Sequence, residues 1–302
     1  MLLEKYFPGF EKKFIDVDEG KVHAVVGGTG KEAILFLHGH PENYLIWRFI
    51  APKLSEKYTV VVTDLRGYGE SSKPEGLDDH SNYSKRVMAR DQVQVMQKLG
   101  FEKFHVVSHD RGSRVAHRLV LDNLDKVNTV TYMDILPTDD MYDSTNMAFA
   151  EKYYHWFLYI QPKPLPEKFL GADPKFFIDF NLRKKIGPTA KPNFPEEIMR
   201  EYTRHFANPE VIHGICEDYR ASYTIDRIHN DEDRDKVIDT PTLALWGANG
   251  IVGKTWDVLA GWKKTCSNVE GLAVENCGHF VPEEQPEIVL EALEKFLEKS
   301  SL

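Results

Sequence analysis

The sequence predicts an α/β fold in which helices cover both faces of a mostly parallel central sheet. Short continuous apolar runs, such as residues 33–37, alternate with longer amphipathic stretches, such as residues 83–99. The short runs suit strands that are buried on both faces, and the longer stretches suit the helices that join them. This alternation stops near Pro137 and returns at Thr242. We therefore expect one α/β core that carries an insertion of a different kind.

The first 136 residues contain most of the predicted core. Two strands flank the turn at Glu19 and Gly20, and four further strands follow. The six strands are predicted at residues 10–17, 21–27, 33–37, 58–63, 104–107 and 127–133. The helices are predicted at residues 42–54, 83–99 and 112–122.

The segment at residues 137–225 predicts a helical cap. It is rich in aromatic residues, contains the proline-rich run at 161–166, and has no strand-like apolar run. The core then resumes with strands predicted at 242–247 and 269–274 and a closing helix at 283–299. We assign residues 1–136 and 226–302 to the core and residues 137–225 to the cap.

The composition restricts the partners of the protein. The chain has 302 residues and a net charge of -9, and 42% of its residues are hydrophobic. An acidic surface repels phosphate backbones, so we expect no nucleic-acid partner, and it suits anionic membranes poorly. A small anionic substrate would need a local positive site that works against the overall field.

The cysteines and the N-terminal residues indicate a cytoplasmic protein. Cys216, Cys266 and Cys277 are an odd, sparse set without a disulfide framework, so we expect reduced thiols. The first residues, MLLEKYFPGFEKK, contain no apolar stretch of signal-peptide length. No apolar run approaches the roughly 20 residues that span a bilayer.

The run Ser108-His109-Asp110-Arg111-Gly112 lies between a predicted strand and a predicted helix. It has the layout of the G-x-S-x-G nucleophile elbow, with Asp110 where serine would stand. The alternative is that Asp110 only caps the helix at 112–122. Two other loops favour the elbow: His38-Gly39, where an oxyanion-hole amide is expected, and the D-x-R-G-x-G-x-S loop at 64–71.

With these loops the sequence resembles the α/β-hydrolase superfamily over nearly the whole chain. An aspartate nucleophile is similar to the dehalogenase and epoxide-hydrolase branches of that superfamily. A carboxylate that attacks a saturated carbon leaves an ester, whose carbonyl water can attack, whereas a serine would leave a stable ether. Asp110 therefore predicts attack on an sp³ carbon followed by ester hydrolysis.

The second step needs a base, and His279 lies after the last predicted strand, where the superfamily has its histidine. A carboxylate should hold the imidazole. The loop at 248–254 contains no acid, but Asp134 ends the strand after the nucleophile helix. We assign this role to Asp134, with Asp139 and Asp140 as weaker candidates.

Arg111 and Arg114 fall in the first turn of the nucleophile helix, where cations are disfavoured. A substrate carboxylate bound by their guanidinium groups would compensate both charges, which favours a haloacid over a neutral haloalkane. The alternative is that both arginines pair with structural acids such as Asp134 or Asp64.

A leaving halide needs hydrogen-bond donors opposite Asp110. His155, Trp156 and Tyr219 in the insertion carry such donors, although Trp156 and Tyr219 could simply pack within the cap. Neighbouring helical residues point about 100° apart, so His155 and Trp156 can share a cavity only near a helix end or bend.

Five motifs together resemble the fluoroacetate dehalogenase family: HDRGSR at 109–114, MDILPT at 133–138, YHW at 154–156, CEDYRA at 216–221 and ALWGA at 244–248. The resemblance implies hydrolysis of fluoroacetate to glycolate and fluoride by a cytoplasmic homodimer that needs no cofactor and no metal. It implies three groups of site residues. The catalytic group is Asp110, Asp134 and His279, the carboxylate group is Arg111 and Arg114, and the halide group is His155, Trp156 and Tyr219.

Two residues depart from the family pattern. Position 108 is serine where glycine is usual, and position 40, in the oxyanion loop, is histidine where an aromatic residue is usual. We expect Ser108 to stiffen the elbow. His40 adds polarity or bulk beside the pocket, which bears on substrate preference and rate rather than on the type of reaction.

Two rival functions remain. An epoxide hydrolase would share Asp110 and His279 and use cap tyrosines, with Tyr153, Tyr154 and Tyr219 available to protonate the epoxide oxygen. The paired arginines disfavour it, because most epoxides are neutral. A catalytically inactive ligand receptor has no need of the complete catalytic set.

Overall fold

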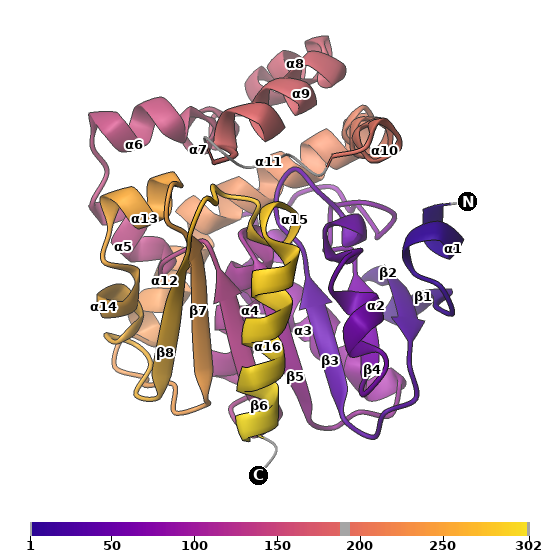
Figure 1. Cartoon of the computed structure of the whole chain (residues 1–302). Coiled ribbons are helices and arrows are strands. Elements are labelled where there is room, and N and C mark those ends of the chain that lie inside the picture. The colour runs from indigo at the N-terminus through magenta and orange to yellow at the C-terminus, as the bar shows by residue number, and fades with distance from the viewer. Residues whose placement is uncertain (1, 188–193, 301–302) are drawn as a thin grey trace.

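A computed structural model describes residues 2–187 and 194–300. One eight-stranded sheet forms the centre of the molecule, in the order β1-β2-β4-β3-β5-β6-β7-β8 (Figure 1). The strands are β1 Glu11–Val17, β2 Gly20–Gly27, β3 Ala33–Leu37, β4 Thr59–Thr63, β5 Phe104–His109, β6 Val127–Met133, β7 Thr242–Gly247 and β8 Val269–Val274. Strands β3 to β8 pair in parallel, and β2 is antiparallel to both β1 and β4. The predicted mostly parallel sheet is confirmed.

Helices cover both faces of this sheet, as predicted. The long helix α16 Pro286–Ser300 crosses one face, and α3 Lys85–Lys98 and α4 Arg111–Asp122 lie against the other (Figure 1). All residues of β3 and β5 are buried between these layers. The continuous apolar character of 33–37 follows from this burial on both faces.

Two predicted helices are each divided in two. The predicted helix at 42–54 is a 3-10 turn, η1 Tyr44–Trp47, followed by α2 Ala51–Leu54. The predicted helix at 283–299 is α15 Val281–Glu284 followed by α16. A proline near the start of each second helix, Pro52 or Pro286, has no N–H to donate and clashes with the preceding turn, so one continuous helix cannot form.

The described part of the segment between β6 and β7 is helical and contains no strand, as predicted for the insertion. Helices α6 to α10 form a layer beyond the carboxyl ends of the parallel strands, and α11 runs across these ends (Figure 1). The division of the chain at residues 137 and 225 stays a prediction. The helices of this segment are α5 Thr138–Asp143, α6 Met147–Lys152, α7 Tyr154–Tyr159, α8 Leu165–Ala172, α9 Pro174–Lys185, α10 Glu196–Phe206, α11 Pro209–Tyr223 and α12 Ile225–Glu232.

The remaining short helices belong to loops around the sheet: α1 Leu2–Tyr6, η2 Ser81–Tyr83, α13 Ile251–Thr255 and α14 Val258–Trp262. Among the residues described, no helix is long and apolar enough to cross a bilayer. The carboxyl ends of β3, β5, β6, β7 and β8 meet beneath the helical layer, so the loops after these strands converge at one place (Figure 1). Functional residues are expected at this edge of an α/β sheet.

Candidate active site

Asp110 occupies a strained turn between β5 and α4. Its backbone has φ 46° and ψ -114°, a region that non-glycine residues rarely adopt and that marks many functional sites. Its side chain makes no capping hydrogen bond to α4, so the alternative that Asp110 merely caps this helix is wrong. The turn instead presents the carboxylate to the loops that converge at the edge of the sheet.

Small residues around Asp110 are a steric requirement. A Cβ at Gly112 would lie 2.4 Å from the carbonyl oxygen of His38, and one at Gly39 would lie 2.5 Å from the Cβ of Asp110. At position 108 the serine fits because its Oγ donates a 2.6 Å hydrogen bond to the carbonyl oxygen of Thr131 on β6. Ser108 thereby ties the elbow to the neighbouring strand.

The two oxygens of the Asp110 carboxylate have different surroundings. Oδ1 accepts a 2.9 Å hydrogen bond from the backbone N–H of His40, so the oxyanion loop supplies this amide from His40 itself. Oδ2 lies 3.7 Å from Nε2 of His279. Burial opposes ionisation, but the neighbouring His279 and His109, with Lys185 and Arg111, hold the pKa of Asp110 below its ordinary value. Asp110 is therefore an ionised carboxylate near neutral pH.

His279 is held by Asp134, which follows β6. Nδ1 of His279 lies 2.6 Å from Oδ2 of Asp134, and Oδ1 of Asp134 accepts from the N–H of Gly247 at 3.1 Å. Burial, and then His109, hold the pKa of His279 well below its ordinary value, which favours the neutral imidazole. Burial also raises the pKa of Asp134 to about 7. With its Nδ1 directed to Asp134, the imidazole presents Nε2 to Asp110 as a base.

The two weaker acid candidates pair with basic side chains instead of His279. Asp139 pairs with Arg227 at 3.2 Å, and Asp140 pairs with Lys264 at 2.9 Å. Both are thus engaged in ion pairs with other elements.

Arg111 is engaged with an acid that the sequence analysis did not assign. Its Nε and Nη2 donate to the two carboxylate oxygens of Asp218, on α11, at 2.7 and 2.9 Å. Asp218 also accepts from the hydroxyl of Tyr68 at 2.7 Å and from Lys85. The acid partner of Arg111 is therefore Asp218, neither Asp134 nor Asp64. Within the described chain, Nη1 of Arg111 is buried without a hydrogen-bond partner.

Arg114 is a buried cation with no carboxylate at ion-pair distance among the described residues. Its Nη1 donates to Oγ1 of Thr138 at 2.8 Å, and its guanidinium lies 4.7 Å from the ring centroid of Trp156. Burial, and then the neighbouring Arg111, lower its pKa. A buried charge is costly unless it is paired, so this position favours an anionic ligand.

The three halide candidates gather at one place. His155 and Trp156 lie in the first turn of α7, at the helix end, where two adjacent residues can face the same region. Their ring centroids lie 5.9 and 6.3 Å from that of Tyr219 on α11. In the part of the chain that is described, Nδ1 of His155 and Nε1 of Trp156 are buried and have no hydrogen-bond partner. Unpaired buried donors of this kind suit a ligand.

The side chain of His40 faces these same rings. It stacks on His155 with centroids 6.1 Å apart and meets Tyr219 edge to face at 5.8 Å. Its Nε2 lies 3.3 Å from the hydroxyl of Tyr159. His40 thus contributes its amide to Asp110 and its ring to the cluster formed by His155, Tyr159 and Tyr219.

This geometry can be compared with known proteins. A family model for the alpha/beta hydrolase fold matches residues 32–286. The chain belongs to the α/β-hydrolase fold family.

Three relatives illustrate the similarity of this α/β hydrolase to known proteins. A fluoroacetate dehalogenase from Burkholderia sp is 41% identical, over 96% of this chain and 95% of its own length. A soluble epoxide hydrolase from Corynebacterium sp. (strain C12) is 32% identical, over 91% of this chain and 93% of its own. A crystal structure of a provisionally assigned α/β hydrolase from Nostoc sp PCC 7120 has 48% identity and a TM-score of 0.92, over 95% of this chain and 98% of that one. The predicted fold and the resemblance to fluoroacetate dehalogenase are confirmed, and the matches support a hydrolase.

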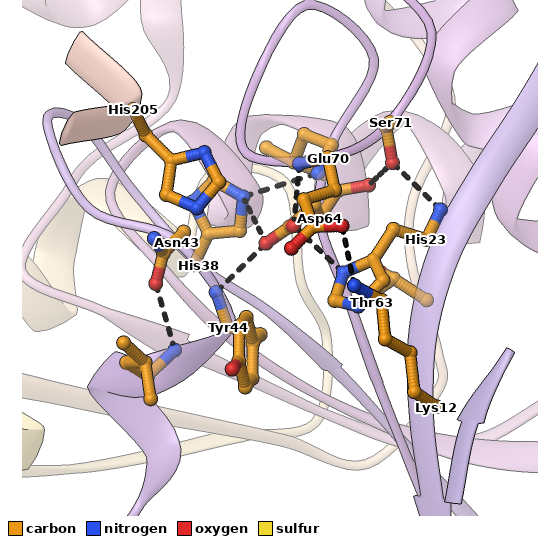
Figure 2. Close-up of polar contacts among 12 residues, drawn as sticks. Lys12, His23, His38, Asn43, Tyr44, Thr63, Asp64, Glu70, Ser71 and His205 are labelled. Atoms are coloured by element: carbon orange, nitrogen blue, oxygen red, sulfur yellow. Dashed lines mark hydrogen bonds and ion pairs between the residues drawn. The ribbon is translucent and has the colours of Figure 1, made fainter. Parts of the chain in front are cut away.

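Beneath the site of this α/β hydrolase, Asp64 joins the oxyanion loop to the loop at 64–71 (Figure 2). Oδ1 of Asp64 accepts from the N–H of Tyr44, and Oδ2 accepts from Glu70 N–H and contacts Nδ1 of His23 at 2.7 Å. His38 also ties the two loops together, because its Nε2 accepts from the N–H of Leu65. Burial opposes ionisation, but His23 and these hydrogen bonds hold the pKa of Asp64 well below its ordinary value. A permanent buried carboxylate thus fixes the loop that carries His40.

A second positioning pair, Glu42 and His109, was not assigned from the sequence. Nε2 of His109 donates to the carbonyl oxygen of His279 at 2.7 Å, and its Nδ1 lies 3.5 Å from Oε2 of Glu42. Burial raises the pKa of Glu42 to about 7. His109, which precedes Asp110, thus connects Glu42 to the backbone of His279.

Proposed function

We propose that this α/β hydrolase is a dehalogenase of small 2-haloacids that converts fluoroacetate to glycolate and fluoride. One observation carries the proposal. In the elbow, Asp110 has one oxygen on the His40 amide and the other 3.7 Å from His279, which Asp134 holds. An ionised carboxylate beside a neutral imidazole is suited to attack carbon first and to hydrolyse the resulting ester second.

In the first step, Oδ2 of Asp110 attacks the carbon that bears the halogen. The new C–O bond forms as the C–halogen bond breaks, and the halide leaves with the electron pair. Negative charge develops on the halide, where His155, Trp156 and Tyr219 would donate hydrogen bonds. Oδ1 becomes the carbonyl oxygen of the ester and keeps the N–H of His40.

In the second step, Nε2 of His279 takes a proton from a water that attacks the carboxyl carbon of Asp110. Charge on Oδ1 is stabilised by the N–H of His40, and charge on the imidazole is stabilised by Asp134. The bond between this carbon and Oδ2 then breaks, and Oδ2 leaves as the hydroxyl oxygen of glycolate. The proton passes from His279 to the departing glycolate, and Asp110 retains the oxygen of the water.

Substrate choice follows from the arginines. Arg114 has no carboxylate partner among the residues described, and Arg111 has Nη1 to spare beyond its contacts with Asp218. A substrate carboxylate would supply the missing anion. The fluoroacetate dehalogenase relative supports the same substrate class.

The second candidate function is an epoxide hydrolase, which the relative from Corynebacterium favours. The buried hydroxyl of Tyr153 has no hydrogen-bond partner in the described residues, and its ring lies 6.3 Å from that of His279. It could protonate an epoxide oxygen. The charge of Arg114, which has no carboxylate partner among the described residues, favours the haloacid.

Side-by-side assays decide between these functions. The purified protein is incubated with fluoroacetate, chloroacetate and styrene oxide, and halide release and diol formation are measured. We expect halide from the haloacids and little diol. Diol without halide would overturn the proposal in favour of the epoxide hydrolase, and binding without either product would favour a ligand receptor.

The homodimer and the cytoplasmic location stay predictions. Analytical ultracentrifugation of the purified protein tests the first, and a sedimentation coefficient of a 34.8 kDa monomer at micromolar concentration would contradict it. Fractionation of the source cells tests the second.

A further inference from the structure

A small cavity of about 150 Å³ opens directly beside His279. It lies where the end of α9, the end of α6 and the start of α13 meet the loop that carries the base. Its lining includes Lys152, Lys185, Lys254, Tyr153 and Asn249, and the described lining contains no aspartate or glutamate. The cavity is therefore cationic, on a chain whose net charge is -9.

Lys185 places part of this charge next to the base and the halide group. Its Nζ lies 3.5 Å from Nε2 of His155 and 5.4 Å from the ring centroid of Tyr153, and its carbonyl oxygen accepts from the N–H of His279. Burial, and then the Lys185 ammonium, hold the pKa of His155 well below its ordinary value. The backbone of Lys185 is thus fixed to the base, and its side chain reaches the halide group.

Lys254 and Lys152 contribute differently. Lys254 is exposed on α13, and no carboxylate among the described residues lies at ion-pair distance from it. Lys152 pairs with Glu151 at 2.7 Å, which offsets much of its charge. The cationic character of the cavity therefore rests mainly on Lys185 and Lys254.

An anionic substrate meets an unfavourable field around this protein. Arg111 is offset by Asp218, and Arg114 is buried, so neither projects much charge into solvent. A local cluster of one sign at an opening raises the concentration of oppositely charged ligands there and speeds their association. Lys254, which is exposed, and Lys185, which is half-buried, lie beside His279 and can supply this effect.

We propose that Lys185 and Lys254 form an electropositive entrance that captures small carboxylate substrates on their way to Asp110. This inference rests on the proposed function, because it takes the substrate to be a haloacid. It assigns the two lysines to the association step, while the chemical steps belong to the residues of the elbow and the base.

The test compares Lys254→Gln, Lys185→Gln and the double variant with the parent enzyme on chloroacetate. Lys299→Gln is the matched control, since it removes the same charge at the far end of α16 (Figure 1). At low salt we expect kcat/KM to fall about fivefold in each single variant and further in the double variant, with kcat falling less than twofold in Lys254→Gln. Lys185→Arg should recover most of the loss, and the double variant should show a flatter dependence of kcat/KM on salt.

Unchanged kcat/KM and unchanged salt dependence in the double variant would overturn the proposed role of Lys185 and Lys254 in substrate capture. A second measurement separates this inference from the proposed function. In Asp110→Asn, stopped-flow tryptophan fluorescence reports the association rate of chloroacetate without turnover. If no haloacid is hydrolysed but the lysine variants still slow association, the entrance stands while the dehalogenase proposal fails.

Discussion

The catalytic residues of the core and the halide residues of the cap differ in how their buried polar groups are paired. In the core, Asp110, Asp134 and His279 each have a hydrogen bond to a backbone group or a side chain of the core. In the described cap, the buried donors of His155 and Trp156 have no such partner. A satisfied group is fixed before the substrate arrives, whereas an unsatisfied group awaits a ligand. We infer that the core sets the reaction and the cap, with Arg114, sets the substrate.

The largest effect is expected from Asp110→Asn in the core. The amide keeps an oxygen for the His40 N–H but is a poor nucleophile, so turnover of every haloacid should fall about 10⁴-fold. Halide release measures the loss, and thermal unfolding within a few degrees of the parent shows that the fold persists. Retention of activity would break the assignment of the reaction to the core.

The next largest effect is expected from His279→Asn. The first step does not need this imidazole, so one equivalent of halide per active site should appear before turnover stops, with roughly 10³-fold slower release afterwards. Mass spectrometry should find the ester as a mass gain on the peptide that holds Asp110. Binding of substrate with no halide burst and no adduct would count against covalent catalysis.

A cap variant, Trp156→Phe, should change the ranking of substrates. It removes the Nε1 donor, which has no partner among the described residues, and keeps an aromatic ring, so kcat for fluoroacetate should fall about 10²-fold. The loss should be smaller for chloroacetate, because chloride is a weaker hydrogen-bond acceptor than fluoride. Tyr142→Phe is the matched control, since it removes another buried donor without a partner among the described residues, the hydroxyl of a ring that lies tilted against Trp156 with centroids 4.9 Å apart. Equal losses for the two substrates would contradict the division between core and cap.

The two arginines should respond differently to the same substitution. Arg114→Met removes a cation without an acid partner among the described residues, so KM for haloacids should rise about tenfold while the fold stays stable. Arg111→Met leaves the buried Asp218 without this partner, so it should also lower the free energy of unfolding by roughly 3–5 kcal/mol. Substrate titrations and urea unfolding measure the two effects. Equal stability of both variants would refute the role of Asp218.

The smallest effect is that of pH. Burial raises the pKa of Asp134 to about 7, and only the ionised carboxylate can stabilise a protonated His279. Turnover should therefore fall as pH drops below about 7, by about tenfold one to two units lower. The pH at which turnover falls should be the same for fluoroacetate and chloroacetate, because the titrating group, Asp134, belongs to the core. If the pH midpoint of this acid-side loss of activity differed between the two substrates, the titrating group would belong to the cap.

The sequence predicts the buried strands and the site motifs better than the contacts between distant segments, because only strands and motifs carry a local signal. Buried strands such as 33–37 carry a local pattern, and the elbow at Asp110 and the base at His279 have fixed places at strand ends. The breaks before Pro52 and Pro286 were missed, although each proline marks a helix start. Proline at the first or second position of a helix is the local signal that marks these breaks.

Contacts between distant segments carry no such local signal. Asp218 reaches Arg111 across more than a hundred residues, and Lys185 reaches His155 from another cap helix. Glu42 and His109 likewise meet only in the fold. Such partners are seen only when the helices are placed in space, which is why the sequence assigned Arg111 to the substrate without its structural acid.

One isotope measurement tests the central claim most directly. A large excess of enzyme is mixed with chloroacetate in water labelled with ¹⁸O for a single turnover. The masses of glycolate and of the peptide that holds Asp110 are then measured by mass spectrometry. Covalent catalysis predicts unlabelled glycolate and one ¹⁸O in the Asp110 side chain. Label in the glycolate with none in Asp110 would contradict the account, because water would then have attacked the substrate directly.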